Sequence, residues 1–220
     1  MKKNKLRIVV SSGPTREPID PVRFISNYST GVLGYKIAEI AQKKGHKVVL
    51  VSGPVDLKKP QGIKLIKVET AREMKKVLLS SLKNSDCLIM NAAVCDYRPL
   101  KFSRQKLKKE NKGLHIELVE NPDILKALSS KKANRLMVGF ALETENLFNN
   151  AFLKLKKKKL DLIVGIKAGR YNSPFGLSKI SPWIIDKTGG CEKLSNITKQ
   201  KLSQKLLDRI EGLWYTKIQS

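Results

Sequence analysis

The sequence predicts an α/β fold with a doubly wound, mostly parallel (Rossmann-like) sheet, a C-terminal β-hairpin and a closing helix. Short apolar runs rich in β-branched residues alternate with segments of helical periodicity, and this alternation is typical of parallel sheets. Two of the runs, 87–94 and 136–142, are apolar enough to be buried on both faces, as parallel strands are. With 220 residues, 41% of them hydrophobic, the chain can bury a sizeable core, and we expect a single domain over residues 1–220.

The first strand is expected at residues 6–10, an apolar run that is too short for a helix. The polar segment 11–34 follows it. Within this segment Pro14, Pro18 and Pro21 each disfavour helix at the residue before them. We therefore expect an extended or turned connection of unusual length after the first strand.

Helix boundaries are marked by capping residues. A first helix is expected over residues 32–44, where apolar residues recur at helical spacing and Gly45 is a suitable stop. Thr70-Ala-Arg-Glu73 is a capping box that opens a second helix. Asn121 is expected to cap a third helix, with Pro122 as its first residue. The other expected elements are strands at 47–53, 63–68, 87–94, 115–119, 136–142 and 160–166, helices at 144–155 and 198–214, and a terminal hairpin with one strand at 182–186 and a turn at 189–190.

The order of strand, polar Gly/Ser/Thr loop and helix indicates anion binding, because backbone amides and a helix N-terminus face outward there. The segment 11–34 contains neither G-x-G-x-x-G nor G-x-x-x-x-G-K-[ST], so no motif indicates dinucleotide or P-loop binding. Ligands of doubly wound sheets sit at the carboxyl ends of the strands. The residues that leave the expected strands, and should converge there, are 11–14, 52–54, 91–98, 139–144 and 165–167.

Composition argues against several classes of protein. No apolar run is long enough for a membrane span, and no signal-peptide apolar region follows the N-terminal MKKNK, so we expect a cytoplasmic protein without a membrane partner. Cys87, Cys95 and Cys191 are odd in number and lack C-x-x-C spacing, which argues against a disulfide framework. With only two histidines in the chain, a zinc site is not favoured either.

The net charge of +25 attracts anions, including nucleotides and nucleic acid. The lysines are spread along the chain, with the densest runs at 106–109 and 156–159, and we expect the second run to be a solvated helix face. A basic nucleic-acid-binding protein remains an alternative, although the aromatic residues are too scattered for base stacking. Tyr97 and Lys101 spell the Y-x-x-x-K dyad of a short-chain oxidoreductase, but Pro99 forbids the regular helix that this dyad needs.

The stretch PTREPIDPVRFISNYSTG (14–31) closely resembles the signature of the phosphopantothenate-cysteine ligase (phosphopantothenoylcysteine synthetase) family. SSGPTREP, VSGP, NAAVCDYRP and VGFALETEN, all at expected strand ends, also resemble signatures of this family. The run 106–109 is similar to its K-x-K-K loop, and LVENPDIL (118–125) to a further segment. The resemblance extends in order from about residue 8 to residue 163 and is more specific than any single motif.

The resemblance implies a ligase that joins 4'-phosphopantothenate to cysteine in coenzyme A biosynthesis. The bacterial type uses CTP with Mg²⁺, releases pyrophosphate and forms an acyl-cytidylate intermediate. Because such an enzyme holds a carboxylate and a triphosphate together, it must neutralise their repulsion. A homodimer is implied, no flavin is expected in this chain, and the flavin-dependent decarboxylase usually fused ahead of this domain would be a separate protein.

Three residues matched to the family motifs have competing interpretations. Asn27 would donate to a developing oxyanion and contact the acid substrate, or would simply make an Asx turn. Lys106 would be the catalytic lysine of a mobile loop, or one of many solvated lysines. Arg23 would bind a phosphate or carboxylate of the substrate, or would pair with Asp20.

The nucleotide contacts implied by the resemblance also have alternatives. Ser29 and Thr30 would bind phosphate oxygens or act as N-caps. Asp96 would contact the nucleotide or position the metal, or would be a loop turn, and Phe140 would belong to the base pocket or to the core. No metal ligands are assigned. The expected nucleotide-binding set is Gly13, Ser29, Thr30, Ala92, Ala93, Asp96, Lys106 and Phe140.

The chain departs from the family pattern at several places, including Cys95 and Leu142 in place of alanines and a blurred loop at residues 173–178. Val32 stands where the family often has lysine, and Gly165-Ile-Lys167 stands where it usually has Ala-Asn-Asp. Substrate contacts from the second of these strand ends are therefore left open.

Overall fold

The structure is a computed structural model that describes residues 5–109, 113–169 and 174–219. Its centre is an eight-stranded sheet in the order β12-β11-β10-β9-β6-β1-β4-β5. The strands from β5 to β10 in this order pair in parallel, and β11 and β12 form an antiparallel edge, which confirms the predicted α/β fold and its terminal hairpin. The strands are β1 (Arg7–Ser12), β4 (Lys47–Ser52), β5 (Lys64–Lys67), β6 (Cys87–Met90), β9 (Leu136–Glu143), β10 (Leu162–Lys167), β11 (Trp183–Asp186) and β12 (Cys191–Lys193).

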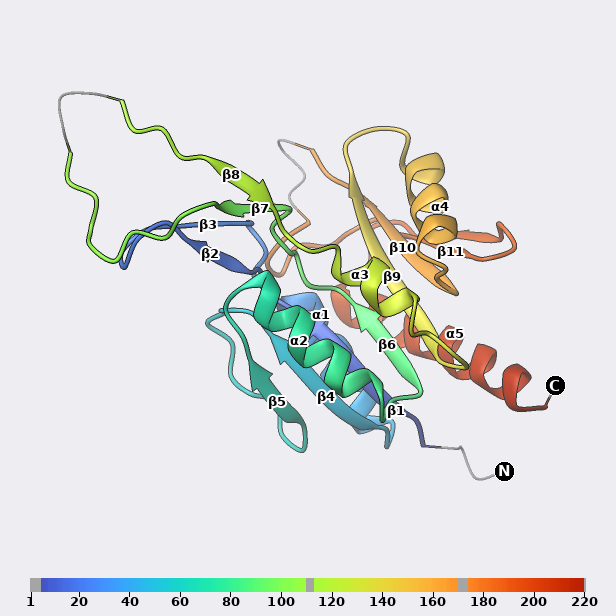
Figure 1. Cartoon of the computed structure of the whole chain (residues 1–220). Coiled ribbons are helices and arrows are strands. Elements are labelled where there is room, and N and C mark those ends of the chain that lie inside the picture. Colours follow the sequence, from blue (N-terminus) through green and yellow to red (C-terminus); the bar gives the residue numbers. More distant parts are fainter. Residues whose placement is uncertain (1–4, 110–112, 170–173, 220) are drawn as a thin grey trace.

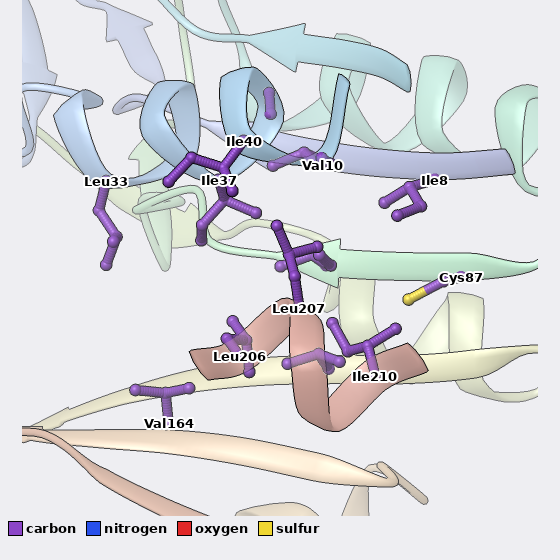
Figure 2. Close-up of a cluster of buried hydrophobic side chains, with 14 of the residues drawn as sticks. Ile8, Val10, Leu33, Ile37, Ile40, Cys87, Val164, Leu206, Leu207 and Ile210 are labelled. Atoms are coloured by element: carbon purple, nitrogen blue, oxygen red, sulfur yellow. The ribbon is translucent and has the colours of Figure 1, made fainter. Parts of the chain in front are cut away.

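Helices cover both faces of the sheet (Figure 1). On one face lie α1 (Val32–Lys43) and α5 (Lys199–Gln219), which pack together over β1 and β10. On the other face lie α2 (Ala71–Leu82), α3 (Ile124–Ser129) and α4 (Leu147–Lys157). Figure 2 shows the first layer, where side chains of α1 and α5 meet those of the sheet. The labelled side chains there are Ile8, Val10, Leu33, Ile37, Ile40, Cys87, Val164, Leu206, Leu207 and Ile210.

The chain changes direction across the sheet between β1 and β6. From β1 it moves through α1 to β4 and β5, and from there it crosses back through α2 to β6, on the other side of β1. The connections that leave β1 and β6 therefore run to opposite faces. Such a switch point leaves a crevice outside the carboxyl ends of the two strands, which is where open α/β sheets bind ligands.

Two small hairpins project from this end of the sheet and lie side by side (Figure 1). One pairs β2 (Arg16–Pro18) with β3 (Phe24–Ser26), and the other pairs β7 (Tyr97–Pro99) with β8 (Leu118–Glu120). We call these hairpins, together with residues 100–109 and 113–117, the arm. Because Tyr97 to Pro99 form a strand, the Tyr97–Lys101 pair does not share a helix face, which rules out the oxidoreductase dyad.

Several predicted boundaries are confirmed and others are wrong. The Thr70 hydroxyl accepts from Glu73 N at 3.2 Å and caps α2 as predicted. The predicted Asn121 cap is wrong, because the Asp123 carboxylate caps α3 by accepting from Lys126 N at 2.9 Å. The helix expected from residue 144 begins at Leu147, since β9 extends to Glu143. In the described part of the chain, no helix is both long and apolar enough to cross a bilayer.

Gly53, directly after β4, allows the connections that follow β1 and β4 to touch. A Cβ atom at Gly53 would lie 1.7 Å from the carbonyl oxygen of Pro14, which is backbone and cannot move aside as a side chain would. Gly53 N also donates to Ser12 O at 3.0 Å. Any residue other than glycine would therefore push the segment after β1 away from the sheet.

We predict that Gly53→Ala lowers the free energy of unfolding by about 1 to 3 kcal/mol, because the added methyl group overpacks this contact. Urea denaturation followed by circular dichroism measures it. The matched control is Gly212→Ala within α5, where a Cβ meets nothing within 4 Å, and it should raise stability by about 0.5 to 1 kcal/mol through helix propensity. Equal effects of the two substitutions would contradict the role given to Gly53.

Candidate active site

A pocket of about 750 Å³ lies at the carboxyl end of the sheet, at the switch point between β1 and β6. Its wall consists of the connections that follow β1 and β6, the carboxyl ends of β9 and β10 and residues 174–176, together with residues of α3 and α5 and the C-terminal part of α4. Seven residues that the sequence assigned to the site line this pocket. They are Asn27, Ser29, Thr30, Ala92, Ala93, Asp96 and Phe140.

Backbone contacts continue the pairing of β1 and β6 beyond the strands and form the floor of the pocket. Ala93 N donates to Gly13 O at 2.9 Å, and Thr15 N donates to Ala93 O at 3.2 Å. Gly13 has a φ of 75° in this contact, a conformation that favours glycine. Gly13 thus supports the wall from behind and does not line the pocket.

Asn27 joins the connections that follow β1 and β6. Its Nδ2 donates to Ala93 O at 3.0 Å and lies 3.7 Å from Cys95 Sγ. Its side chain is otherwise exposed toward the pocket, and no Asx turn of Asn27 is found in the described part of the chain. The carboxamide is therefore oriented by the pocket wall.

The start of α1 presents backbone donors to the pocket. Gly31 is the N-cap residue with a φ of 75°, and no side chain caps the helix. Ser29 and Thr30 are not N-caps, because the Ser29 hydroxyl accepts from Gly31 N at 3.4 Å and the Thr30 hydroxyl accepts from Gly176 N at 3.1 Å. The uncapped first turn retains backbone N–H groups that can bind an anion.

Arg23 does not enter the pocket, and its alternative role, pairing with Asp20, is the one observed. Its guanidinium bonds the buried Asp20 carboxylate at 2.5 Å and donates to Leu107 O at 2.8 Å. Asp20 in turn accepts from Leu107 N at 3.1 Å, and the bonds from Arg23 hold the pKa of this carboxyl well below its usual range. The pair therefore clamps the backbone next to Lys106.

Lys106 is exposed on the arm and does not line the pocket of its own chain. The clamp on its neighbour Leu107 holds the base of this segment against the β2–β3 turn. The backbone beside Lys106 is therefore fixed, and its side chain is exposed to solvent.

Three lysines that sequence reasoning missed do line the pocket. Lys154 on α4 donates to Phe140 O at 2.8 Å, and burial lowers its pKa. Lys158, whose side chain is 13% exposed, forms an ion pair with Asp123, so the expectation that all of 156–159 is a solvated face is wrong at this position. Lys199 comes from the first turn of α5. Spacing was the available signal for the first two, because residues i and i+4 share a helix face.

Phe140 and Asp96 have mixed surroundings. Phe140 lines the pocket and also packs against the α1–α5 core cluster, and its role in a base pocket stays a prediction. Asp96 has an exposed side chain at the pocket, and its backbone carbonyl accepts from Asn121 N at 2.7 Å. Within the described ranges, no group of three or more His, Cys, Asp or Glu side chains could hold a metal ion.

Comparison of sequences identifies relatives over nearly the whole chain. The coenzyme A biosynthesis bifunctional protein CoaBC of Bacillus subtilis is 41% identical over 207 residues, which cover 94% of this chain and 51% of that protein. The CoaBC protein of Escherichia coli is 39% identical over 209 residues, with 93% and 51% covered. The chain therefore spans about half the length of these curated relatives.

Solved structures and a family model agree with the sequence matches. The crystal structure of the C-terminal domain of CoaBC superposes with a TM-score of 0.82 at 36% identity and covers 97% of both chains. A Cab2 mutant in complex with phosphopantothenate-cysteine shares the fold, with a TM-score of 0.78 at 18% identity over 100% of this chain and 90% of that one. The model of the DNA/pantothenate metabolism flavoprotein C-terminal domain matches residues 3–213. The chain therefore belongs to that family, which confirms the family resemblance of its motifs.

Proposed function

We propose that this chain forms the amide between 4'-phosphopantothenate and cysteine in coenzyme A biosynthesis. CTP activates the carboxylate as an acyl-cytidylate, with release of pyrophosphate, and the amine of cysteine then displaces CMP. The observation that supports this proposal most directly is one pocket that gathers Asn27, Asp96 and Phe140 with one buried and two partly buried lysines. The relatives are named for coenzyme A biosynthesis, and the chain matches the C-terminal half of such a protein. A flavin-dependent decarboxylase would use the product.

The pocket lysines meet the electrostatic demand of this reaction. A carboxylate and a triphosphate repel each other, and the repulsion is strong where water is excluded. Lys154 in α4 and Lys158 at its C-cap are four residues apart and line the same pocket, so they can bind two phosphate groups of the nucleotide. The first-turn amides of α1 would bind further phosphate oxygens.

Mg²⁺ is proposed to enter with the nucleotide. Since the described side chains form no metal cage, the phosphates would supply most of its ligands, which is the usual arrangement for this ion. Asp96, with an exposed carboxylate in the pocket, is the residue proposed to hold it. When bound, the ion would neutralise phosphate charge and orient the triphosphate.

Asn27 is proposed to act on the second half-reaction. One amide hydrogen is used by the Ala93 carbonyl, which fixes the plane of the carboxamide. The second hydrogen, now directed only toward the weak acceptor Cys95 Sγ, remains available. It can donate to the oxygen that becomes negative when the amine attacks the acyl carbon.

A second copy of the chain is proposed to bind the arm. The arm exposes large apolar side chains on both hairpins, and such a patch marks an interaction surface. A homodimer through this surface would bury the patch and bring Lys106 of one copy to the pocket of the other, where it would compensate phosphate charge. The exposed apolar residues of the arm are Val22, Phe24, Tyr97, Leu100, Phe102, Leu114, Ile116 and Leu118.

The purified chain should release pyrophosphate from CTP when 4'-phosphopantothenate and Mg²⁺ are present. It should form 4'-phosphopantothenoylcysteine only when cysteine is added as well. A coupled phosphate assay and mass spectrometry of the products measure the two half-reactions separately. Absence of turnover with both CTP and ATP would contradict the proposed function.

We expect Asn27→Asp to slow amide formation by about 100- to 1,000-fold, because loss of one oxyanion donor has effects of that size. Pyrophosphate release in a single turnover should change only a few-fold. Asn84→Asp is the control, because Asn84 lies at the amino ends of the strands, far from the pocket wall. An equal loss in both half-reactions would contradict the role given to Asn27.

Lys154→Met should raise the KM for CTP by about 10- to 100-fold, as expected for the loss of a charge-assisted bond. Lys157→Met, at an exposed position of the same helix, should leave that KM unchanged. Burial lowers the pKa of Lys154 from 10.5, so its positive charge is lost at a lower pH than that of an ordinary lysine. As the pH is raised, the KM for CTP of the wild type should therefore start to increase before the pH reaches 10.5. The KM of Lys154→Met should change less with pH. An unchanged KM in that variant would exclude Lys154 from nucleotide binding.

A further inference from the structure

Lys199 is a buried cation that has no counter-ion among the residues that the structure describes. It is 7% exposed, and its Nζ donates to the backbone carbonyl of Ser178 at 3.0 Å. No ion pair of Lys199 is found among the described residues, and burial alone lowers its pKa, with no charged neighbour contributing. A buried ammonium group is unfavourable unless negative charge accompanies it, and the described part of the chain places no carboxylate in an ion pair with this one.

The position of Lys199 in its helix is also unfavourable for a positive charge. Lys199 is the first residue of α5, and the Thr198 hydroxyl accepts from Lys201 N at 3.1 Å, as an N-cap does. The first turn of a helix is the positive end of the helix dipole, where cations are disfavoured and anions are stabilised. Both the burial and the helix position of Lys199 are unfavourable for the protein alone.

The segment around Lys199 is firmly held. Ile180 and Ile197 exchange two backbone hydrogen bonds of 2.9 Å, which hold the Ser178 carbonyl near the start of α5. Gly176 N donates to the Thr30 hydroxyl, so the same segment is also tied to the start of α1. Lys199 therefore belongs to a fixed part of the pocket wall, to which Thr30 and residues 174–176 also contribute.

Lys199 lies on the other side of the sheet from Lys154 and Lys158. Its helix α5 packs with α1 on one face, whereas α4 packs on the opposite face. All three lysines nevertheless line one pocket, because that pocket crosses the carboxyl edge of the sheet. The pocket therefore has two separate cationic ends.

We propose that Lys199 binds the phosphate group of the phosphorylated acid substrate while Lys154 and Lys158 bind the nucleotide. This assignment rests on the proposed function. 4'-Phosphopantothenate is an extended molecule with a phosphate at one end and the reacting carboxylate at the other. With its phosphate at Lys199 and the Thr30 corner, its carboxylate would extend toward the nucleotide and Asn27. Lys199 then distinguishes the phosphorylated acid from its unphosphorylated form.

The kinetic test compares Lys199→Met with Lys201→Met, an exposed position two residues further on in the same helix. Lys199→Met should raise the KM for 4'-phosphopantothenate by about 10- to 100-fold. Its kcat/KM with unphosphorylated pantothenate and its KM for CTP should stay within about 3-fold of wild type, and Lys199→Arg should restore part of the loss. An unchanged KM for 4'-phosphopantothenate, or an equal rise in both KM values, would overturn the assignment.

Thermal unfolding provides a readout that does not depend on catalysis. 4'-Phosphopantothenate should raise the Tm of the wild type more than pantothenate does, and this difference should vanish in Lys199→Met but persist in Lys201→Met. Without ligand, Lys199→Met should unfold at the same or a higher temperature than wild type. A lower Tm together with a retained phosphate preference would show a structural role and overturn the proposal. If the preference depends on Lys199 but no CTP is turned over, the phosphate site stands and the ligase function fails.

Discussion

The contact between the segment after β1 and the strand ends on either side of it is the constraint on which the site depends. Pro14 touches Gly53 on one side, and Thr15 and Gly13 exchange backbone bonds with Ala93 on the other. This contact extends the β1–β6 pairing beyond the sheet and holds Asn27 against the next connection. Without it, the long connection after β1 could not form the pocket floor.

The basic residues that produce the net charge of +25 are not all on the solvent-exposed surface. Most lysines are exposed, but three are drawn into the pocket, from two helices on opposite faces of the sheet. A buried lysine is unfavourable unless an anion accompanies it, and Lys158 alone of the three has a carboxylate partner within the described residues. The pocket can therefore accompany several anionic groups at once, and the proposed joining of an acid to a nucleotide would require this.

The arm links the pocket to a surface that its own chain leaves open. The Asp20–Arg23 pair fixes the backbone at Leu107, and the apolar side chains of both hairpins face outward. The family motif assigns Arg23 to a phosphate or carboxylate of the substrate. In the structure Arg23 instead anchors the segment that contains Lys106. The same pair connects the segment after β1 with the segment after β6 at a second point, beyond the pocket floor.

The sequence by itself determined the order of the helices and of the strands of the central sheet, the loop after β1 and most of the pocket wall, because hydrophobic periodicity, prolines and contiguous motifs are local properties. It did not predict the short strands β2, β3 and β7. Seven of its assigned residues line one pocket. Only the tertiary structure decided that Arg23 binds Asp20, that Asp123 rather than Asn121 caps α3, and that Lys199 enters the pocket. Those outcomes depend on contacts between segments that are far apart in the chain. The sequence has 44 basic residues, and no local pattern distinguishes the few that are shielded from water.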